Sequence, residues 1–184
     1  MIEKNNKSRS NILYIFMAVL LVIISLLFVA KPIMRKAYTL KYEDIIITCS
    51  NEYNLDKYLV MGIISTESKF DENAVSHKGA KGLMQLKDET ASWCIKQFNI
   101  STDCSADELN IRVGCSYIRY LIDKYNGNIE TALAAYNAGE GNVAQWLEKQ
   151  ENKDGYILSS IPYKETEKYV KTVKKRMKIY KFLY

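Results

Sequence analysis

The sequence has 184 residues, with 26 Lys or Arg against 21 Asp or Glu and a formal net charge of +5. Residues 1–36 hold six of the basic residues and one acid, so residues 37–184 hold twenty of each sign. This balance excludes the basic surplus that a nucleic-acid-binding domain needs, and we expect no nucleic acid partner. With one histidine and no Cys-x-x-Cys pair, we expect no metal site, and nothing in the composition indicates another cofactor.

The first predicted element is an apolar helix at residues 12–30, nineteen residues without a charge. As a helix this run is long enough to cross the hydrocarbon core of a bilayer. Phe28 is bulky where a signal peptide would carry a small residue before its cleavage site, which favours an uncleaved anchor. We therefore predict an N-terminal cytoplasmic segment at 1–11, a transmembrane signal-anchor at 12–30 and a linker at 31–41.

Residues 42–184 are predicted to form one all-α domain, because helical periodicity recurs along them and strand signals are few. Pro162 is the only proline in this stretch. Helices are predicted at 42–52, 55–68, 88–98, 106–125, 129–137, 140–149 and 164–181. Plausible N-cap residues for four of them are Asn54, Asp88, Ser105 and Asn128.

The most informative residue is Glu67, near the end of the second of these helices. Val60, Ile63 and Ile64 precede it by seven, four and three residues, which places all four side chains on one helical stripe. A carboxylate that faces the core either finds partners or has its pKa raised by desolvation. A Glu that is protonated near neutral pH is suited to general acid catalysis. The alternative is an ordinary helix-end Glu that turns out to solvent or pairs with a lysine.

The four cysteines, Cys49, Cys94, Cys104 and Cys115, leave two interpretations open. In an exported domain they could form two disulfides, and Cys94 with Cys104 would close a short loop. Free, partly buried thiols are the other interpretation.

Four short sequence motifs occur in order along the predicted domain. They are Glu67-Ser68, Gly-Leu-Met-Gln at 82–85, Ala-Tyr-Asn-Ala-Gly at 135–139, and Ile161-Pro162 with Glu165, Thr166, Tyr169 and Val170. Between them, Asn110, Gly114 and Tyr117 recur along one predicted helix. In these residues the chain resembles, over roughly 43–180, the catalytic domain of the soluble-lytic-transglycosylase family. The resemblance implies a lysozyme-like helical fold and an enzyme that cleaves peptidoglycan without a cofactor.

The resemblance also implies roles for individual residues. Glu67 would act first as general acid and then as base, cleaving the bond between N-acetylmuramic acid and N-acetylglucosamine with a 1,6-anhydromuramoyl product. The residues that would bind or support the glycan are Ser68, Met84, Gln85, Tyr136, Asn137, Glu165 and Tyr169. Met84 and Gln85 would line the groove, Tyr136 and Asn137 would face the acid, and Glu165 and Tyr169 would act from the last helix. Considered as residues alone, Met84 is as compatible with the core, and Ser68 with a helix terminator.

Two other functions stay open. A hydrolytic lysozyme of the same fold would need a second carboxylate, for which Asp71, Glu72, Asp88 and Glu89 are candidates without a recognisable motif. A non-catalytic wall-binding scaffold, anchored beside cell-envelope machinery, would not need Glu67. In each case the expected partners are peptidoglycan glycan strands and, through the N-terminal helix, the membrane. The expected location of the domain is the wall side of the cell membrane, because the implied substrate lies there.

Overall fold

The structure is a computed structural model that describes the backbone of residues 2–150 and 155–184, and within these all side chains except those of residues 2–12, 23, 26 and 27. The chain divides into one compact unit built on residues 1–39 and a second built on residues 40–182.

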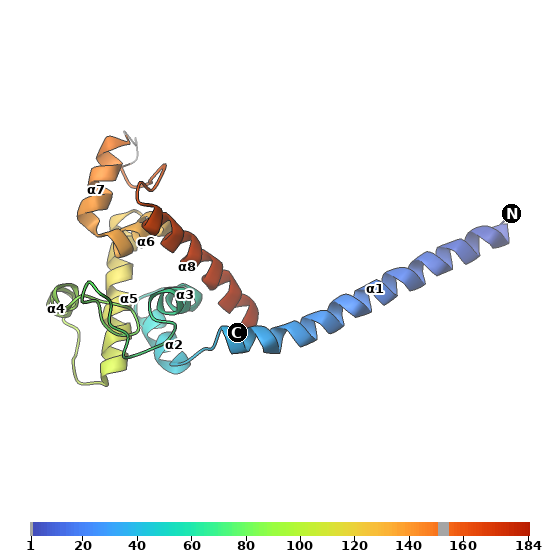
Figure 1. The fold of residues 1–184 in the computed structure, drawn as a ribbon, viewed down its shortest axis with the longest axis horizontal. Coiled ribbons are helices and arrows are strands. Elements are labelled where there is room, and N and C mark those ends of the chain that lie inside the picture. The colour runs from blue at the N-terminus through green and yellow to red at the C-terminus, as the bar shows by residue number, and fades with distance from the viewer. Residues whose placement is uncertain (1, 151–154) are drawn as a thin grey trace. The chain divides into compact units, whose positions relative to one another are not determined.

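The first unit is a single helix, α1 (Ile2–Ala37), drawn in blue in Figure 1. It contains the segment predicted at 12–30 and continues through most of the predicted linker at 31–41, because the residues after Pro32 are mainly good helix formers. Within the described part of the chain, no helix combines the length and the apolar character that a membrane crossing requires. The side chains of residues 12, 23, 26 and 27 in the predicted span lie outside the described residues, and the anchor at 12–30 stays a prediction from the sequence. The side chains of the predicted segment at 1–11 lie outside the described residues.

The second unit is helical, as predicted, and all seven helices expected there are present. They are α2 (Glu43–Glu52), α3 (Lys57–Glu67), α4 (Asp88–Gln97), α5 (Ala106–Lys124), α6 (Ile129–Ala138), α7 (Glu140–Lys149) and α8 (Lys164–Leu183). Among the described residues, extended pairing is limited to two isolated antiparallel bridges, Val75 with Lys81 and Lys81 with Leu86. Both bridges lie in the loop between α3 and α4.

Two of the four predicted N-caps are confirmed. Ser105 and Asn128 cap α5 and α6, each accepting a backbone N–H bond with its side-chain oxygen, at 3.2 and 2.8 Å. The prediction for Asn54 is wrong, because Asp56 caps α3 and Asn54 adopts a left-handed turn conformation with φ 50° before it. Asp88 is the first helical residue of α4 and not its cap.

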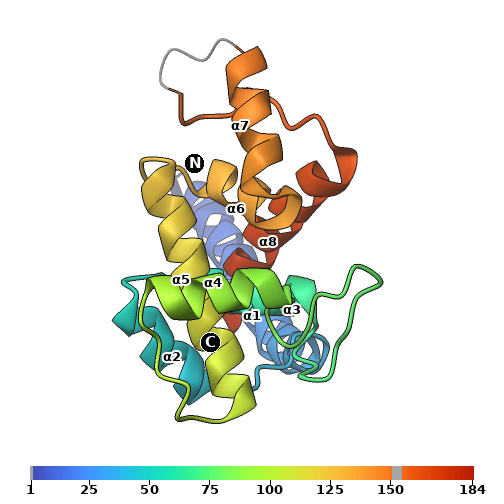
Figure 2. The same cartoon turned by 90° about the vertical axis from the view of Figure 1, so that its left-hand side faces the viewer.

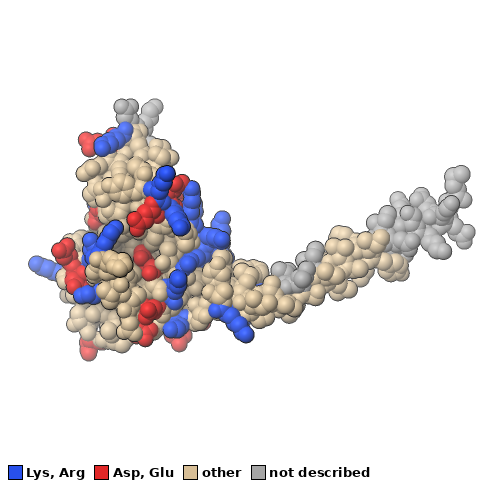
Figure 3. Space-filling model, viewed as in Figure 1, with Lys and Arg blue, Asp and Glu red and all other residues tan. Residues whose placement is uncertain are grey.

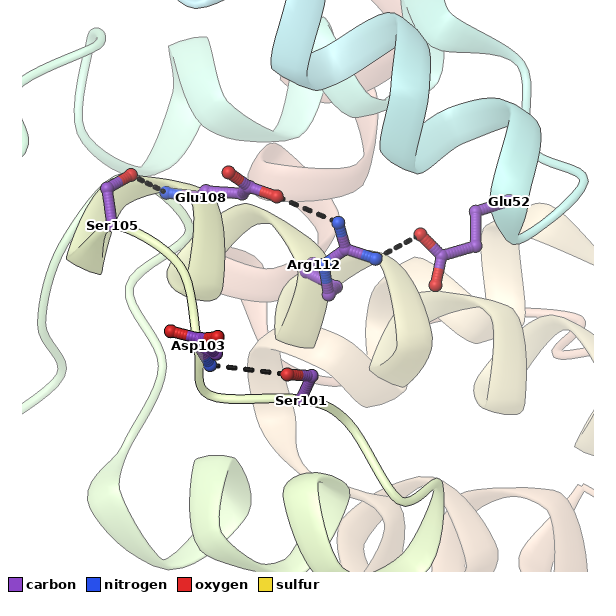
Figure 4. Close-up of polar contacts among 6 residues, drawn as sticks. All are labelled: Glu52, Ser101, Asp103, Ser105, Glu108 and Arg112. Carbon is purple, nitrogen blue, oxygen red and sulfur yellow. Dashed lines mark hydrogen bonds and ion pairs between the residues drawn. The ribbon is translucent and has the colours of Figure 1, made fainter.

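Helix α5 is the centre of the domain, in contact with α2, α4 and α6. Figure 2 shows α4 lying across it. Its inward stripe is fully buried at Ile111, Cys115, Ile118 and Leu121. At its outer face, Arg112 joins α5 to α2, pairing with Glu52 of α2 and with Glu108 one turn earlier on α5 (Figure 4).

All four cysteines are free thiols, and three of them are buried. Of the two interpretations left open by the sequence, the structure therefore has the free thiols and not the Cys94–Cys104 disulfide. Burial raises the pKa of Cys49 and of Cys94 to about 11. The thiol that interacts electrostatically with Cys104 is Cys49 on α2, whereas Cys94 interacts with Ser116 on α5.

Charged side chains of both signs are interspersed on the visible face of the domain (Figure 3). Several form ion pairs between elements, such as Lys124 of α5 with Glu140 of α7 and Lys174 of α8 with Glu130 of α6. These pairs are partly exposed, so each contributes little to the free energy of unfolding.

Candidate active site

Glu67 is the last residue of α3, and its carboxyl is largely enclosed although the residue keeps some open surface. Ile63 and Ile64, on the same stripe, are fully buried, as the periodicity predicts. Burial raises the pKa of Glu67 to about 7, against an opposing, smaller effect of Tyr169. Within the described residues no lysine or arginine pairs with Glu67. The carboxyl is therefore held partly protonated near neutral pH.

Two tyrosines from other helices lie close enough to Glu67 for its charge to act on them. Tyr169 on α8 interacts with the Glu67 carboxyl, yet among the described residues its buried hydroxyl has no hydrogen bond of ordinary length. Tyr136 on α6 donates its hydroxyl hydrogen to the backbone carbonyl of Met84 at 2.8 Å. Burial first, and then the Glu67 charge, raises the pKa of both tyrosines well above 10. Both hydroxyls therefore stay neutral and keep oxygen lone pairs that can accept from a carboxylic acid.

Ser68 ends helix α3. Its hydroxyl donates to the carbonyl of Ile64 at 3.2 Å and accepts from the backbone N–H of Phe70 at 3.1 Å. Lys69 and Phe70 both have left-handed φ angles, 55° and 64°, so the chain turns sharply directly after the carboxylate. Ser68 is buried and acts as the helix terminator that its residue type allows.

The Gly-Leu-Met-Gln element forms a tight turn opposite this helix end. Gly82 has φ 75°, and its N–H donates to the carbonyl of Ala74 at 2.9 Å. The side-chain NH₂ of Gln85 donates to two carbonyls, those of Ala74 and Gly82, each at 2.9 Å. Both hydrogens of this amide are therefore used inside the loop that carries them.

Met84 is fully buried, which corrects the prediction that its thioether packs on the sugar. Its side chain fills the space above Gly114 on α5, where a Cβ atom would lie 2.2 Å from the Met84 sulfur. Its backbone is held from two sides, by Asn110 Oδ1, which accepts its N–H at 2.8 Å, and by Tyr136. The Gly-Leu-Met-Gln turn is thus fixed to α5 and α6 together.

A pocket of about 560 Å³ opens in front of Glu67. Its walls come from the end of α3, the loop between α3 and α4, the start of α4, the middle of α5, the end of α6 and the start of α8. The lining residues include both charged and apolar groups, as in pockets that bind small polar ligands. The titratable, amide and aromatic side chains on its lining include Glu67, Gln85, Glu89, Tyr117, Tyr136, Asn137 and Glu165.

The structure brings five of the eight predicted site residues to this pocket. They are Glu67, Gln85, Tyr136, Asn137 and Glu165. Asn137 is oriented by Thr166, whose buried hydroxyl donates to Asn137 Oδ1 at 2.8 Å. Ser68, Met84 and Tyr169 are not on the lining surface and support the site from behind it.

Two further pocket residues bring an aromatic ring and a carboxylate to the site. Tyr117 lines the pocket, and its ring lies 5.4 Å from that of Tyr136. Its position three residues after Gly114 and seven after Asn110 is the sequence signal, because all three then share one face of α5. Glu89, one of the four candidates for a second carboxylate, lines the pocket from the first turn of α4. Acidic residues are ordinary at that position, so nothing in the sequence distinguishes it from the other three.

Among the candidates for a second carboxylate, Glu89 is the one that lines the pocket. Glu72 accepts a hydrogen bond from Tyr42, and Asp88 pairs with Lys81 at 2.7 Å. In the part of the chain that the structure describes, no three His, Cys, Asp or Glu residues are grouped so that they could hold a metal ion.

Comparisons with known proteins give a consistent result. The model of the transglycosylase SLT domain family matches residues 44–159. The soluble lytic murein transglycosylase of Escherichia coli K12 is 32% identical over an alignment of 147 residues that covers 76% of this chain and 23% of that protein. The membrane-bound lytic murein transglycosylase C of Sodalis glossinidius is 31% identical over 135 residues, covering 66% of this chain and 38% of that protein.

Comparison with solved structures gives the same family. The crystal structure of the 70 kDa soluble lytic transglycosylase from Escherichia coli superposes with a TM-score of 0.71 and 31% identity. The match covers 80% of this chain and 25% of that one. The chain therefore spans well under half the length of these relatives.

Proposed function

The chain belongs to the transglycosylase SLT domain family, and we propose that it cleaves the glycan strands of peptidoglycan as a lytic transglycosylase. The observation that supports this proposal most is the carboxyl of Glu67, whose pKa burial raises to about 7 at the wall of a pocket large enough for sugar residues. A general acid is most effective when its pKa lies near the working pH.

In the proposed reaction, Glu67 gives its proton to the oxygen between N-acetylmuramic acid and N-acetylglucosamine as the C1–O bond breaks. The acetamido group of the muramoyl residue stabilises the positive charge at C1. Glu67, now a carboxylate, removes the proton from the muramoyl 6-hydroxyl, whose oxygen bonds to C1. The products are a 1,6-anhydromuramoyl end and a free N-acetylglucosamine hydroxyl, no water is consumed, and Glu67 regains its proton. The internal nucleophile is favoured by its proximity to C1.

The surrounding groups have distinct proposed tasks. The carbonyl oxygen of Gln85 and the amide of Asn137 bind sugar hydroxyl or acetamido groups. Tyr136, whose hydrogen is donated to Met84, offers an oxygen lone pair that orients the Glu67 carboxylic acid. Tyr169 is available to donate to Glu67 once it becomes a carboxylate, because its hydroxyl is buried beside it. Glu165 contacts sugar hydroxyls at the open rim of the pocket.

A hydrolytic lysozyme is the second candidate, because Glu89 and Glu165 place two further carboxylates on the same pocket. Either one could activate water on the far side of the sugar ring. Mass spectrometry of muropeptides separates the two reactions, since the anhydro product is lighter than the hydrolytic product by one water.

The direct test is Glu67→Gln, which keeps the shape of the side chain and removes its proton. We expect purified peptidoglycan to lose turbidity with the native chain and not with Glu67→Gln, while both still bind the insoluble wall. Glu148→Gln, an exposed change on α7 away from the pocket, is the matched control and should clear the wall normally. Normal clearing by Glu67→Gln would remove Glu67 from its assigned role, whereas a native chain that binds the wall without clearing it would favour a wall-binding scaffold.

We place the domain on the wall side of the cell membrane, because its proposed substrate is found there. Attachment through residues 12–30 stays a prediction from the sequence. Fractionation of cells that express the full chain, or a chain that begins at residue 38, tests the attachment. Protease treatment of intact spheroplasts tests the side of the membrane.

A further inference from the structure

A row of aromatic side chains leads away from the pocket. It begins at Tyr136 and Tyr117, which line the pocket and whose rings lie 5.4 Å apart. The ring of Trp93 on α4 lies 6.4 Å from Tyr117 and 5.0 Å from Tyr120, which is one turn further along α5. Phe98, just after α4, lies 5.6 Å from Trp93. The aromatic surface is therefore continuous from the site of Glu67 to the outer end of α4.

The outer part of this row is open to solvent. Trp93 is 40% exposed and Phe98 is 37% exposed, although large aromatic side chains are usually covered. The inner members, Tyr117 and Tyr120, are half-buried and pack edge-to-face with Trp93, whose ring is inclined at 82° to that of Tyr117 and at 64° to that of Tyr120. Trp93 is therefore fixed by packing while part of its indole surface stays accessible.

The position of Trp93 ties it to the pocket through its own helix as well. Glu89 and Thr90, in the first turn of α4, line the pocket, and Trp93 follows them by four and three residues. Residues at this spacing share one face of a helix. A ligand that leaves the pocket along α4 meets the indole next.

The rim of this aromatic surface is polar. Tyr120 donates its hydroxyl to Glu140 at 3.1 Å, and the ammonium of Lys124 lies 5.7 Å above the Tyr120 ring while pairing with Glu140. An apolar ring bordered by a carboxylate and an ammonium fits a ligand with an apolar face and polar edges. Pyranose sugars have this form, with C–H groups on the ring faces and hydroxyl groups around the edge.

We propose that Trp93 and Phe98 form a sugar-stacking subsite, which binds residues of the glycan strand beyond those held at the cleavage pocket. This inference rests on the proposed function, because it takes the ligand to be the same strand that Glu67 cleaves. The glycan strand is the occupant because the row is continuous with the pocket, where it starts at Tyr136 and Tyr117. The subsite makes affinity depend on strand length, because only a long oligosaccharide reaches from the pocket to Trp93.

The test measures binding without chemistry, in the full chain carrying Glu67→Gln. A further Trp146→Phe change leaves Trp93 as the only tryptophan, so its fluorescence reports on the subsite directly. The probes are oligomers of β-1,4-linked N-acetylglucosamine, the disaccharide and the hexasaccharide. We expect the hexasaccharide to shift the Trp93 emission and the disaccharide to leave it unchanged.

The second readout is the affinity for each sugar, measured by calorimetry. Each substitution is made in the chain that carries Glu67→Gln and retains Trp146. Trp93→Ala should weaken hexasaccharide binding by about 3- to 10-fold, the size of an aromatic stacking contribution, and leave disaccharide binding unchanged. Tyr156→Ala removes an aromatic side chain that is 44% exposed and lies away from the row, so it should change neither affinity. If Trp93→Ala fails to fold, the same two affinities are measured for Phe98→Ala and Trp93→Phe. We expect each to lose less affinity for the hexasaccharide than Trp93→Ala would, and none for the disaccharide.

Equal affinities of the Trp93→Ala and parent chains for the hexasaccharide would overturn the subsite. An equal loss for both sugars would do so as well, because it would mean that the pocket itself had changed. Concentration-dependent sedimentation of the parent chain that disappears in Trp93→Ala would show instead that the row binds a second copy of the chain. The proposed function fails separately, if the native chain does not clear the wall, whereas length-dependent binding is measured without any cleavage.

Discussion

Replacing Glu67 by Gln should make the protein more stable at alkaline pH and change little at acidic pH. The reason is the pKa of Glu67, which burial raises from 4.5 in the unfolded chain to about 7 in the fold. Because the folded-state pKa is the higher one, the folded chain binds more protons between these two values. Its free energy of unfolding therefore falls as pH rises from about 4.5 to about 7, and the loss is complete above that range. Gln has no proton to lose and escapes this penalty.

The size of the effect follows from the shift. One pKa unit corresponds to about 1.4 kcal/mol, so the shift of Glu67 amounts to about 3 kcal/mol of differential stability. In a protein of this size, 1 kcal/mol moves the melting temperature by about 2–4 °C. We therefore expect Glu67→Gln to melt about 6–12 °C above the native chain at about pH 8. At about pH 4 the two chains should melt together.

Thermal unfolding followed by circular dichroism, at a series of pH values, measures this difference. Met84→Leu is the control, because it changes a buried side chain in the same region without adding or removing a titrating group. The difference in melting temperature between Met84→Leu and the native chain should be the same at every pH. A Glu67→Gln difference that is equally independent of pH would refute the reasoning, since the carboxyl would then not be held protonated by the fold.

The remaining predictions concern the same site. The rate of wall clearing should fall about tenfold per pH unit above about 7, as Glu67 loses its proton, and a rate that stays constant to pH 9 would contradict its role as the acid. Tyr136→Phe should lower the free energy of unfolding by about 1–3 kcal/mol in urea titrations, because the carbonyl of Met84 loses its buried donor; an unchanged midpoint would mean that this bond contributes nothing. Gly114→Ala should cost about 1–3 kcal/mol by crowding the Met84 sulfur, whereas Gly141→Ala, on α7 with open space around it, should gain about 0.5–1 kcal/mol. Equal effects of the two alanines would show that the space above Gly114 is not limiting.

The helices and the environment of Glu67 could be predicted from the sequence because both depend on local spacing. A stripe of Val60, Ile63 and Ile64 fixes which way Glu67 faces whatever the rest of the chain does, and the raised pKa follows from burial alone. Ser105 and Asn128 could be predicted as caps for the same reason.

The side chains that were misplaced depend on partners far along the chain. Met84 was assigned to the groove, but its direction is decided by the missing side chain at Gly114, thirty residues later. Closeness in sequence is the only argument for pairing Cys94 with Cys104, whereas the packing of α2 against α5 puts Cys49 in the environment of Cys104. Nothing in the sequence separates Glu89 from the other candidates for a second carboxylate, because its place depends on where α4 meets the pocket.

The two carbonyls that occupy the amide hydrogens of Gln85 have a consequence for inhibitor design. Only the oxygen of this side chain is left to meet a bound molecule, so the position behaves as an acceptor whatever approaches it. A compound should therefore present an N–H or O–H group there. An ether or ester oxygen at the same point would face another lone pair and lose affinity, even if its shape matched that of a sugar.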